Sequence, residues 1–375
     1  MRPEVRSQIV AAWAPRVMRL AASPAAVAAA ADLSSPQGVS VLVLAVLASR
    51  FGTPIEPAVC AVLVSALLAL LDHPAELHRS AAAELLGKGY ASWRPHVTDV
   101  PALIRTLFRL SAAHMRFTSE RSSAAGGSEG GETAGGGRGG EESSSGGTPL
   151  PALNRFHAAL LAVGTVEPRA FCRAMGEHAV HMGGTNSARI AAVHAMIALV
   201  KARGTSLEAD LPVVVQAVLR PLDPSVPQLR EGCLAASTTA LRELVKRYPM
   251  MSFHQGTQRL AVGTTEGVVM IYDLRTATKW RILQGHEKAV SALAFSSSGE
   301  HVASLAAEER SIRWWLAGSH GFFGFLGLQG SCLHVTNVEQ PLGADTGILG
   351  IEWTSPTSVT LTSNRKPIGA YSRPP

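Results

Sequence analysis

The chain has 375 residues, 46% of them hydrophobic and 17% charged, a length and composition that allow two or three domains with buried cores. Its formal charge of +6 is spread thinly along the sequence and is not gathered into Lys/Arg runs, which argues against a nucleic-acid-binding protein. The longest apolar runs, Val41 to Ala48 and Val59 to Leu71, are shorter than the roughly 18 residues that predict a membrane-spanning helix.

The four cysteines lie far apart, with no Cys-x-x-Cys pair and no histidine at ligand spacing beside them. This pattern predicts buried free thiols in a reducing compartment rather than disulfides or a metal site. We therefore expect neither a metal nor a cofactor. The cysteines are Cys60, Cys172, Cys233 and Cys332.

Residues 1 to 117 show a helical periodicity that proline and glycine interrupt. Between Glu56 and Leu71, for example, Val59, Leu63 and Leu67 follow one face, and alanines elsewhere let a neighbour approach closely. Short helices that are apolar on more than one face predict an α-solenoid of the HEAT or armadillo type, in which each helix pair covers the next. The expected helices are Glu4 to Ala22, Pro36 to Phe51, Glu56 to Leu71, Glu76 to Gly89 and Val100 to His114.

A segment with almost no apolar residues comes next. Between Thr118 and Thr148 the sequence reads "SERSSAAGGSEGGETAGGGRGGEESSSGG". Because such a composition cannot offset the entropy of ordering, residues 118 to 149 are predicted to be a disordered linker. A formal Gly-x-Ser-x-Gly at Gly126 to Gly130 lies inside it, without the strand-turn-helix that a nucleophile elbow needs.

Helical periodicity resumes in residues 150 to 248, the second part of the predicted solenoid. His178 and His181 lie three residues apart in one of these helices, but no further ligand is near enough in sequence to complete a metal site. The expected helices are Leu153 to Val163, Glu167 to Met182, Ser187 to Ala202, Leu207 to Arg220 and Val226 to Arg247.

After Tyr248 the apolar period changes from about 3.6 to 2, which predicts β-strands. The stretch "QRLAVGTTEGVVMIYDLR" reads as two strands around a Thr-Glu-Gly turn, and "KAVSALAF", "HVASLA" and "SIRWWL" continue the pattern. We therefore assign residues 249 to 362 to a β domain, with a closing strand near its end. Residues 363 to 375 are interpreted as a tail.

Two stretches of the β domain align at one offset of 42 residues (253 to 295). A period of this length, made of four strands, is that of a WD-type propeller blade, so the sequence predicts two such blades after the helices. The matched pairs are Phe253 with Phe295, Leu260 with Val302, Ala261 with Ala303, Glu266 with Glu308, Ile271 with Arg313 and Tyr272 with Trp314.

The second blade has residues at the landmark positions of such a repeat. Gly285 and His286 precede its innermost strand, and Trp314 lies on its third strand. In a regular blade a histidine, a serine, an acid and the indole hydrogen-bond to one another and hold the loop against the sheet. We interpret the set as structural rather than catalytic; its predicted members are His286, Ser304, Glu308 and Trp314.

The first blade departs from this pattern, because its dipeptide is Tyr272-Asp273 and its serine position is Val262. Two blades cannot close a ring, since a propeller needs about four to eight. We therefore expect an incomplete carboxy-terminal segment whose open edges favour association.

An apolar loop, "GFFGFLG", follows the third strand of the second blade. Its glycines are spaced like those of a phosphate-binding loop, but no strand-to-helix turn with a lysine follows. Phe322, Phe323 and Phe325 are expected either to contact a partner or a membrane, or to pack back onto the neighbouring blade.

The stretch "FHQGTQRLAVGTTEGVVMIYDLRTATKWRILQGH", followed by "AVSALAFSSSGEHVAS", resembles the carboxy-terminal WD repeats of the rabconnectin beta subunit family. The resemblance is strong over Ser252 to Leu316 and looser over the helices, where it includes "HRSAAAELLGKGYASWRPHV". The segment "LGIEWTSPTSVTL" is similar to the family's closing strand, whereas "NRKPIGAYSRPP" is not similar to its ending. The family implies a large scaffold with blades at its amino end, a helical solenoid and a last pair of blades.

The resemblance also implies a function. Family members associate with the rabconnectin alpha subunit on synaptic and endolysosomal vesicles and assist assembly of the vacuolar proton pump. We accordingly expect a non-catalytic, cytoplasmic, vesicle-associated scaffold that binds proteins, does not bind nucleic acid and meets membranes only through its partners. A general vesicle-trafficking or coat-type scaffold of the same architecture is the alternative, and a hydrolase that uses His and Ser residues is the candidate from another class.

Overall fold

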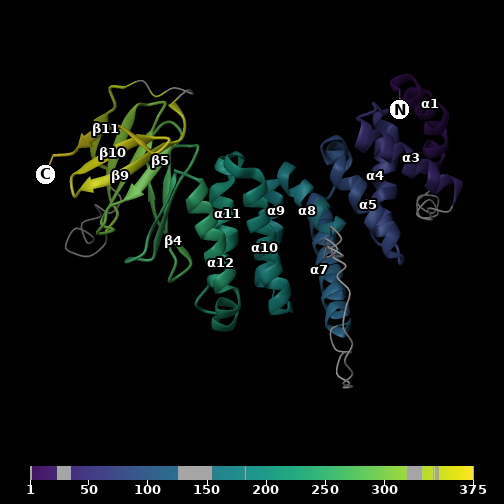
Figure 1. Ribbon diagram of the computed structural model, residues 1–375, viewed down its shortest axis with the longest axis horizontal. Coiled ribbons are helices and arrows are strands. Elements are labelled where there is room, and N and C mark those ends of the chain that lie inside the picture. Colours follow the sequence, from purple (N-terminus) through teal and green to yellow (C-terminus); the bar gives the residue numbers. More distant parts are fainter. Residues whose placement is uncertain are drawn as a thin grey trace, which may run out of the picture. The chain divides into compact units, whose positions relative to one another are not determined.

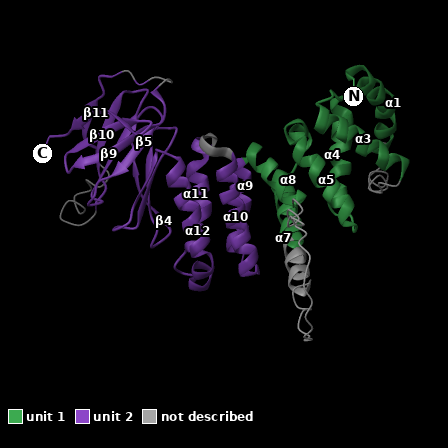
Figure 2. Cartoon of the chain, in the orientation of Figure 1, with its two compact units in different colours: residues 1–167 green, residues 168–375 purple. Residues whose placement is uncertain are grey.

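The computed structural model describes residues 2–22, 35–125, 154–181, 183–318, 332–340, 342 and 346–374. The chain divides into two compact units, residues 1–167 and 168–375 (Figure 2). The first unit is helical, and the second consists of helices followed by antiparallel sheets (Figure 1). Within the described ranges, no helix combines the length and the apolar character needed to cross a membrane.

Proline sets the start of several helices in the first unit. Helices α1 (Pro3–Met18), α3 (Pro36–Phe51) and α4 (Pro57–Leu70) each begin with proline, whose fixed φ and missing N–H suit the first turn. The Ser35 side chain caps α3 by accepting a hydrogen bond from the Gly38 amide at 2.9 Å. The other helical segments of the unit are η1 (Arg19–Ala22), α5 (Glu76–Lys88), α6 (Tyr90–Trp93), η2 (Arg94–His96), α7 (Val100–Ala125) and α8 (Arg155–Val166).

Helix α7 is longer than the sequence pattern predicts. It continues to Ala125, whereas the expected helix ends at His114 and the expected linker begins at residue 118. Residues 118–125 contain no glycine or proline, and the first glycine pair follows directly at Gly126 and Gly127, so nothing in this stretch stops a helix. The rest of the predicted linker, residues 126–149, lies outside the described residues.

The second unit begins with a group of helices that leads directly into the sheets. Helix α10 packs against both α9 and α12, and α12 also packs against the first strand. The predicted helix from Leu207 to Arg220 is in fact a 3₁₀ segment followed by a shorter α-helix. The helical segments are α9 (Pro168–Val180), α10 (Asn186–Arg203), η3 (Gly204–Asp210), α11 (Leu211–Leu219), η4 (Arg220–Leu222) and α12 (Pro227–Arg247).

Two four-stranded antiparallel sheets follow, and each has its strands in sequence order. The first contains β1 (Met251–His254), β2 (Arg259–Gly263), β3 (Val269–Asp273) and β4 (Thr278–Leu283). The second contains β5 (Ala292–Phe295), β6 (His301–Ala306), β7 (Ser311–Leu316) and β8 (Cys332–Asn337).

A third sheet of three strands corrects the prediction of a single closing strand and a tail. It contains β9 (Leu349–Ser355), β10 (Ser358–Ser363) and β11 (Lys366–Ser372), so most of the predicted tail is a strand. Asn364 and Arg365 join β10 to β11 with φ angles of 48° and 67°. A two-residue hairpin of this kind needs positive φ at both positions, and asparagine adopts it readily. Because Asn364 is followed by arginine and not by the more common glycine, the sequence pattern did not predict this hairpin.

The sheets are stacked through their first strands and inner faces. Strand β1 lies beside β5, and β5 lies beside β9, as expected for successive propeller-type sheets. Side chains from the second and third sheets form one apolar cluster, which includes Ile312, Trp314, Ile351 and Leu361. The fold is therefore a helical region followed by propeller-type sheets.

Candidate functional site

The sequence-predicted site lies where the loop before β5 meets the second sheet. The imidazole of His286 is completely buried, and its Nε2 lies 2.8 Å from Oγ of Ser304 on β6. Its Nδ1 lies 3.0 Å from Oε2 of Glu309, in the turn between β6 and β7. On β7, the Trp315 indole donates a hydrogen bond of 2.8 Å to the same Ser304 oxygen. These four residues are the blade network.

The donors and acceptors of the blade network fit one arrangement of protons. Since Trp315 Nε1 can only donate, Ser304 Oγ accepts that bond and has its own hydrogen left for Nε2 of His286. Nδ1 of His286 then carries the proton and donates it to Glu309. Burial lowers the pKa of His286, and the bond to Glu309 only partly opposes this, so the imidazole is neutral.

Glu309 is the charged member of the blade network. It also accepts hydrogen bonds from the Ser311 hydroxyl at 2.8 Å, from the Lys288 amide at 2.6 Å and from the Glu287 amide. Burial alone would raise the pKa of this carboxyl, but the hydrogen bonds from His286, Ser311 and the two amides lower it to about 2. One ionised carboxylate therefore fixes both the histidine and the loop that carries it.

Two predicted members, Glu308 and Trp314, are not in the blade network. Glu308 is exposed, and the network contains Glu309 in its place. Likewise, it contains Trp315 in place of Trp314. Strand pairing gives the reason: Ala261 pairs with Ile271 in the first sheet, whereas Ala303 pairs with Trp314 in the second. The offset is 42 residues for the second strands (261 to 303) but 43 for the third strands (271 to 314). The chain between the paired residues of β6 and β7 is therefore one residue longer than that between β2 and β3. This shifts the alignment of the third strands of the two sheets by one residue.

Trp314 is buried on the opposite face of β7, because successive side chains of a strand alternate. Its ring meets Trp353 of β9 edge to face, with centroids 5.4 Å apart and planes at 85°. Its Nε1 donates to Thr336 Oγ1 at 2.9 Å, and Nε1 of Trp353 donates to the carbonyl of Ala294 at 3.0 Å. Trp314 thus joins the second sheet to the third, whereas Trp315 contacts the loop that leads from β4 to β5.

Two glycines let the loop before β5 approach its neighbours. A Cβ on Gly285 would lie 2.8 Å from the ring of Trp315. Gly267, in the turn between β2 and β3, has a φ of +81°, and a Cβ there would lie 2.3 Å from the carbonyl oxygen of His286. Gly285 is therefore required at its landmark position, because a side chain there would collide with the Trp315 indole.

The first sheet has no equivalent of the blade network. Tyr272 is buried at the position of Trp315, but Val262 replaces Ser304 and offers no hydroxyl. The Asp273 carboxylate instead holds the turn after β3, where it pairs with the Arg275 guanidinium at 2.7 Å. The hydrogen bond from Arg275 lowers the pKa of Asp273.

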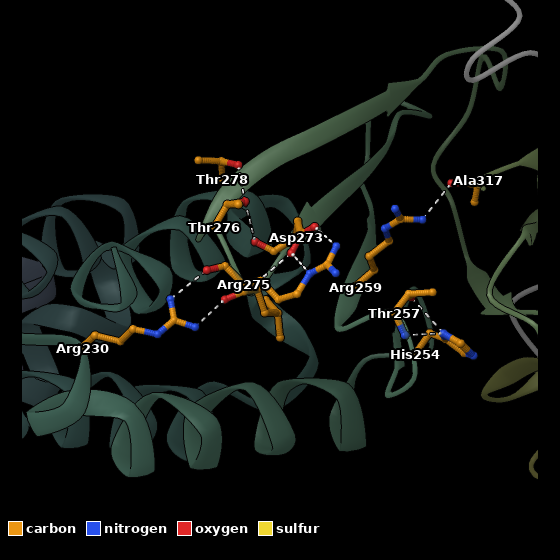
Figure 3. A network of polar contacts seen from close by, with 10 residues as sticks. Arg230, His254, Thr257, Arg259, Asp273, Arg275, Thr276, Thr278 and Ala317 are labelled. Atoms are coloured by element: carbon orange, nitrogen blue, oxygen red, sulfur yellow. Dashed lines mark hydrogen bonds and ion pairs between the residues drawn. The ribbon is translucent and has the colours of Figure 1, made fainter. Parts of the chain in front are cut away.

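Helix α12 is fastened to this same turn (Figure 3). The Arg230 guanidinium donates to the carbonyls of Arg275 at 2.9 Å, Leu274 at 3.4 Å and Leu222 at 2.6 Å. The helices of the second unit are thereby joined to the first sheet through the landmark Asp273 turn.

The chemistry of the blade network resembles a Ser-His-acid triad, but its surroundings do not suit catalysis. Ser304 and the imidazole of His286 are both completely buried. The Ser304 oxygen is also engaged by the Trp315 indole. A nucleophile must be reachable and presented beside oxyanion donors, as in an exposed nucleophile elbow. The arrangement therefore locks a loop onto a sheet.

The other candidate residues from the sequence take no part in a shared site. His178 and His181 lie at the end of α9 and just beyond it, and among the described residues no group of three His, Cys, Asp or Glu side chains is placed to hold a metal. The four cysteines are free thiols, and burial raises the pKa of Cys172 to about 12. Phe322, Phe323 and Phe325, like Gly126 to Gly130, lie outside the described residues.

The first unit contains a pocket of about 260 Å³ beside the start of α4. Its walls include Pro54, Pro57, Cys60, Trp93 and His96. Burial raises the pKa of Cys60, so its thiol is protonated and not poised for nucleophilic attack.

One family model matches a range that includes the helices of the second unit and its first two sheets. Residues 167–341 match the family model described as the β-propeller of "Nucleolar protein 10-like, N-terminal domain", which covers under half of the chain. A solved structure, the Cps50 (Swd1) β-propeller domain of Myceliophteria thermophila, is 21% identical with a TM-score of 0.22. That alignment covers 34% of this chain and 38% of the other.

Proposed function

We propose that the chain is a protein-interaction scaffold without a catalytic centre. The observation that carries this proposal is the blade network itself. Its histidine, serine and carboxylate are all engaged inside the second sheet and its loop, so the residues best suited to chemistry have a structural task. The match to a β-propeller family model supports the same conclusion, because such domains generally act by binding other proteins.

We further propose that the stacked sheets pack against additional blades supplied by a partner or by a longer chain. The described residues form three sheets, and about four to eight are needed to close a propeller. The third sheet has three strands where each of its neighbours has four, so β11 is an outer edge that another strand could extend.

The resemblance to the rabconnectin beta family supports a more specific proposal. In it, the chain works on the cytoplasmic side of synaptic or endolysosomal vesicles and binds the rabconnectin alpha subunit. It would thereby assist assembly of the vacuolar proton pump and vesicle acidification. The residues that support this proposal are those of Ser252 to Leu316, which cover nearly all of the first sheet and strands β5 to β7 of the second.

A second candidate comes from the matched family model, which is named for a nucleolar protein. A scaffold in the nucleolus would use the same helices and sheets with different partners. A general trafficking or coat-type scaffold is the third possibility of this architecture.

Affinity capture with the full chain separates these proposals. Bait chain is incubated with vesicle-rich cytosol and, in parallel, with nucleolar extract, and bound proteins are quantified. Enrichment of the rabconnectin alpha subunit and proton-pump subunits is the result we expect. Coat components or nucleolar proteins in their place would refute the vesicle-acidification role but would still agree with a protein-interaction scaffold.

A separate assay tests the absence of catalysis. The wild-type chain and S304A are incubated with a generic activated ester. We expect no turnover above buffer for either protein. Turnover by the wild type that S304A abolishes would show that the blade network is a hydrolase site and would overturn the scaffold proposal.

A further inference from the structure

The last strand of each sheet in the second unit is an edge. Strands β4, β8 and β11 each pair with a single strand among the described residues. An edge strand presents backbone amides and carbonyls with which another chain can pair, and natural proteins discourage such pairing with charged side chains, proline or bulges. The three edges differ in how far they are protected in this way.

Two of the edges, β4 and β11, carry protective residues. Strand β4 contains Lys279 and Arg281. Strand β11 begins with Lys366 and Pro367, and proline has no amide hydrogen to donate to a neighbouring strand. Both strands therefore oppose the addition of a further strand of like charge.

The edge strand of the second sheet, β8, lacks these residues. Its sequence, "CLHVTN", contains no lysine, arginine, acid or proline. The ladder between β7 and β8 has a bulge, but the ladder between β3 and β4 has one as well, so bulges do not distinguish the two edges. Of the three edges, β8 is the one without charge and without proline.

The exposed face of β8 is apolar. Side chains alternate along the strand, and Leu333 and Val335 are 43% and 42% exposed, whereas Cys332, His334 and Thr336 are half-buried. The strand thus combines open backbone groups with two exposed apolar side chains on one face. That combination suits pairing with a second strand, which would cover both features.

We propose that two copies of this chain associate by antiparallel pairing of their β8 strands. A two-fold axis at His334 places Leu333 of each copy opposite Val335 of the other, on one face of the pair. A neutral strand can meet its own copy without bringing like charges together, whereas β4 and β11 cannot. This self-complementarity selects a second copy as the occupant of the edge.

Self-association through β8 is separate from the scaffold proposal. It leaves β11 unpaired, and β11 is the edge at which additional blades are proposed to join. A chain that fails to self-associate would therefore leave the scaffold proposal standing, and affinity capture tests that proposal on its own.

Analytical ultracentrifugation of the full chain tests the pairing. We expect the mass to rise with concentration from that of one chain to that of two, because an interface built on one strand pair is small and weak. V335K puts a charge against the Leu333 side chain of the other copy and should weaken the dimer at least about tenfold. Since Val335 is an exposed residue, urea unfolding at low concentration should show that the variant still folds.

The matched control is I282K. Ile282 is 51% exposed on β4, so the same change adds the same charge to an edge that is not assigned to the dimer. This variant should associate like the wild type. Equal weakening in I282K and V335K would indicate a general effect of surface charge, and unchanged association in V335K would remove β8 from the interface. Either result overturns the proposal.

Crosslinking tests the position of the two-fold axis. In a C332S background, H334C places the two introduced thiols opposite each other, within the reach of a disulfide. We expect covalent dimers of this variant after mild oxidation and none of I282C in the same background. If H334C does not crosslink under conditions in which the dimer persists, the pairing of β8 with itself is wrong.

Hydrogen exchange distinguishes a second copy from other occupants. The β8 amides should become protected at the concentrations at which the dimer forms. A wild type that stays monomeric at every concentration overturns the proposal. A monomer whose β8 amides become protected only in vesicle-rich cytosol would assign the edge to a different protein and would also overturn self-pairing.

Discussion

The two faces of β7 form joints of opposite chemistry. On one face, Trp315 meets a polar joint with His286, Ser304 and the ionised Glu309. On the other face, Trp314 meets an apolar joint with Trp353 and the aliphatic side chains of the third sheet. The polar joint depends on hydrogen-bond direction and charge, and the apolar joint depends on volume. Substitutions at the two joints should therefore differ in size and in pH dependence.

The largest effect is expected at the apolar joint. W314A removes a completely buried indole and should lower the free energy of unfolding by about 3 to 5 kcal/mol, through lost burial and a cavity. W314F keeps most of the ring and loses the bond to Thr336, so it should cost about 1 to 2 kcal/mol. Urea unfolding followed by fluorescence measures both. Equal losses for the two variants would show that volume does not govern this joint.

The next effect, at Glu309, should depend on pH. E309Q removes the charge that accepts bonds from His286, Ser311 and two amides, at a cost of about 2 to 3 kcal/mol at pH 7. The pKa of Glu309 is lowered to about 2 from 4.5, so its contribution is complete above pH 4.5 and is lost as pH falls toward 2.

His286 adds a second contribution to the free energy of unfolding, which is also lost as the pH falls. Burial lowers its pKa from 6.5, so the stability due to the neutral imidazole is present above pH 6.5 and is lost on acidification. Urea unfolding between pH 3 and 8 should therefore show the wild type losing stability below about pH 6.5 and again below about pH 4.5. E309Q should remove the lower step and enlarge the upper one, because the charge of Glu309 partly opposes the lowering of the His286 pKa. A lower step of unchanged size in E309Q would contradict the assignment of that charge.

A smaller loss is expected for S304A. It removes the acceptor of the Trp315 indole and the donor to His286, and should cost about 1 to 2 kcal/mol in urea unfolding. S304T is the matched control, since it keeps a hydroxyl and adds a methyl group. If S304A proves as stable as the wild type, the hydroxyl does not link the indole to the imidazole.

The smallest effect on stability is expected at Glu308, and it tests most directly which glutamate belongs to the polar joint. E308Q changes an exposed carboxylate one residue from Glu309, and should alter the free energy of unfolding by no more than about 0.5 kcal/mol. The pair E308Q and E309Q therefore tests the one-residue shift in the second sheet. A larger loss for E308Q than for E309Q in the same assay would restore the uniform offset of 42.

Much of the architecture follows from local patterns in the sequence. The change of apolar period after Tyr248 marks the end of the helices, since α12 ends at Arg247 and β1 begins at Met251. The offset of 42 holds for the first two strands of each sheet, where Phe253 pairs with Leu260 and Phe295 with Val302. These features depend on residues close in sequence, which periodicity detects.

The remaining features depend on contacts that periodicity does not contain. The extra residue before β7 cannot be detected in the sequence, because Trp314 and Trp315 are adjacent and offer an indole in either alignment. An adjacent pair, Glu308 and Glu309, hides the shift at the acid in the same way. The stacking of Arg259 and Arg281 on the Trp280 ring was not predicted, because the two arginines lie on different strands, β2 and β4.

The tandem tryptophans have a consequence for folding. A slip of β7 by one residue would exchange its faces, and one of the two tryptophan positions would still be filled by the other tryptophan. Arg313, which shares a face with Trp315, would then be carried into the apolar cluster, where a charge is strongly disfavoured. The position of Arg313 between Ile312 and Trp314 therefore disfavours the slipped register of β7.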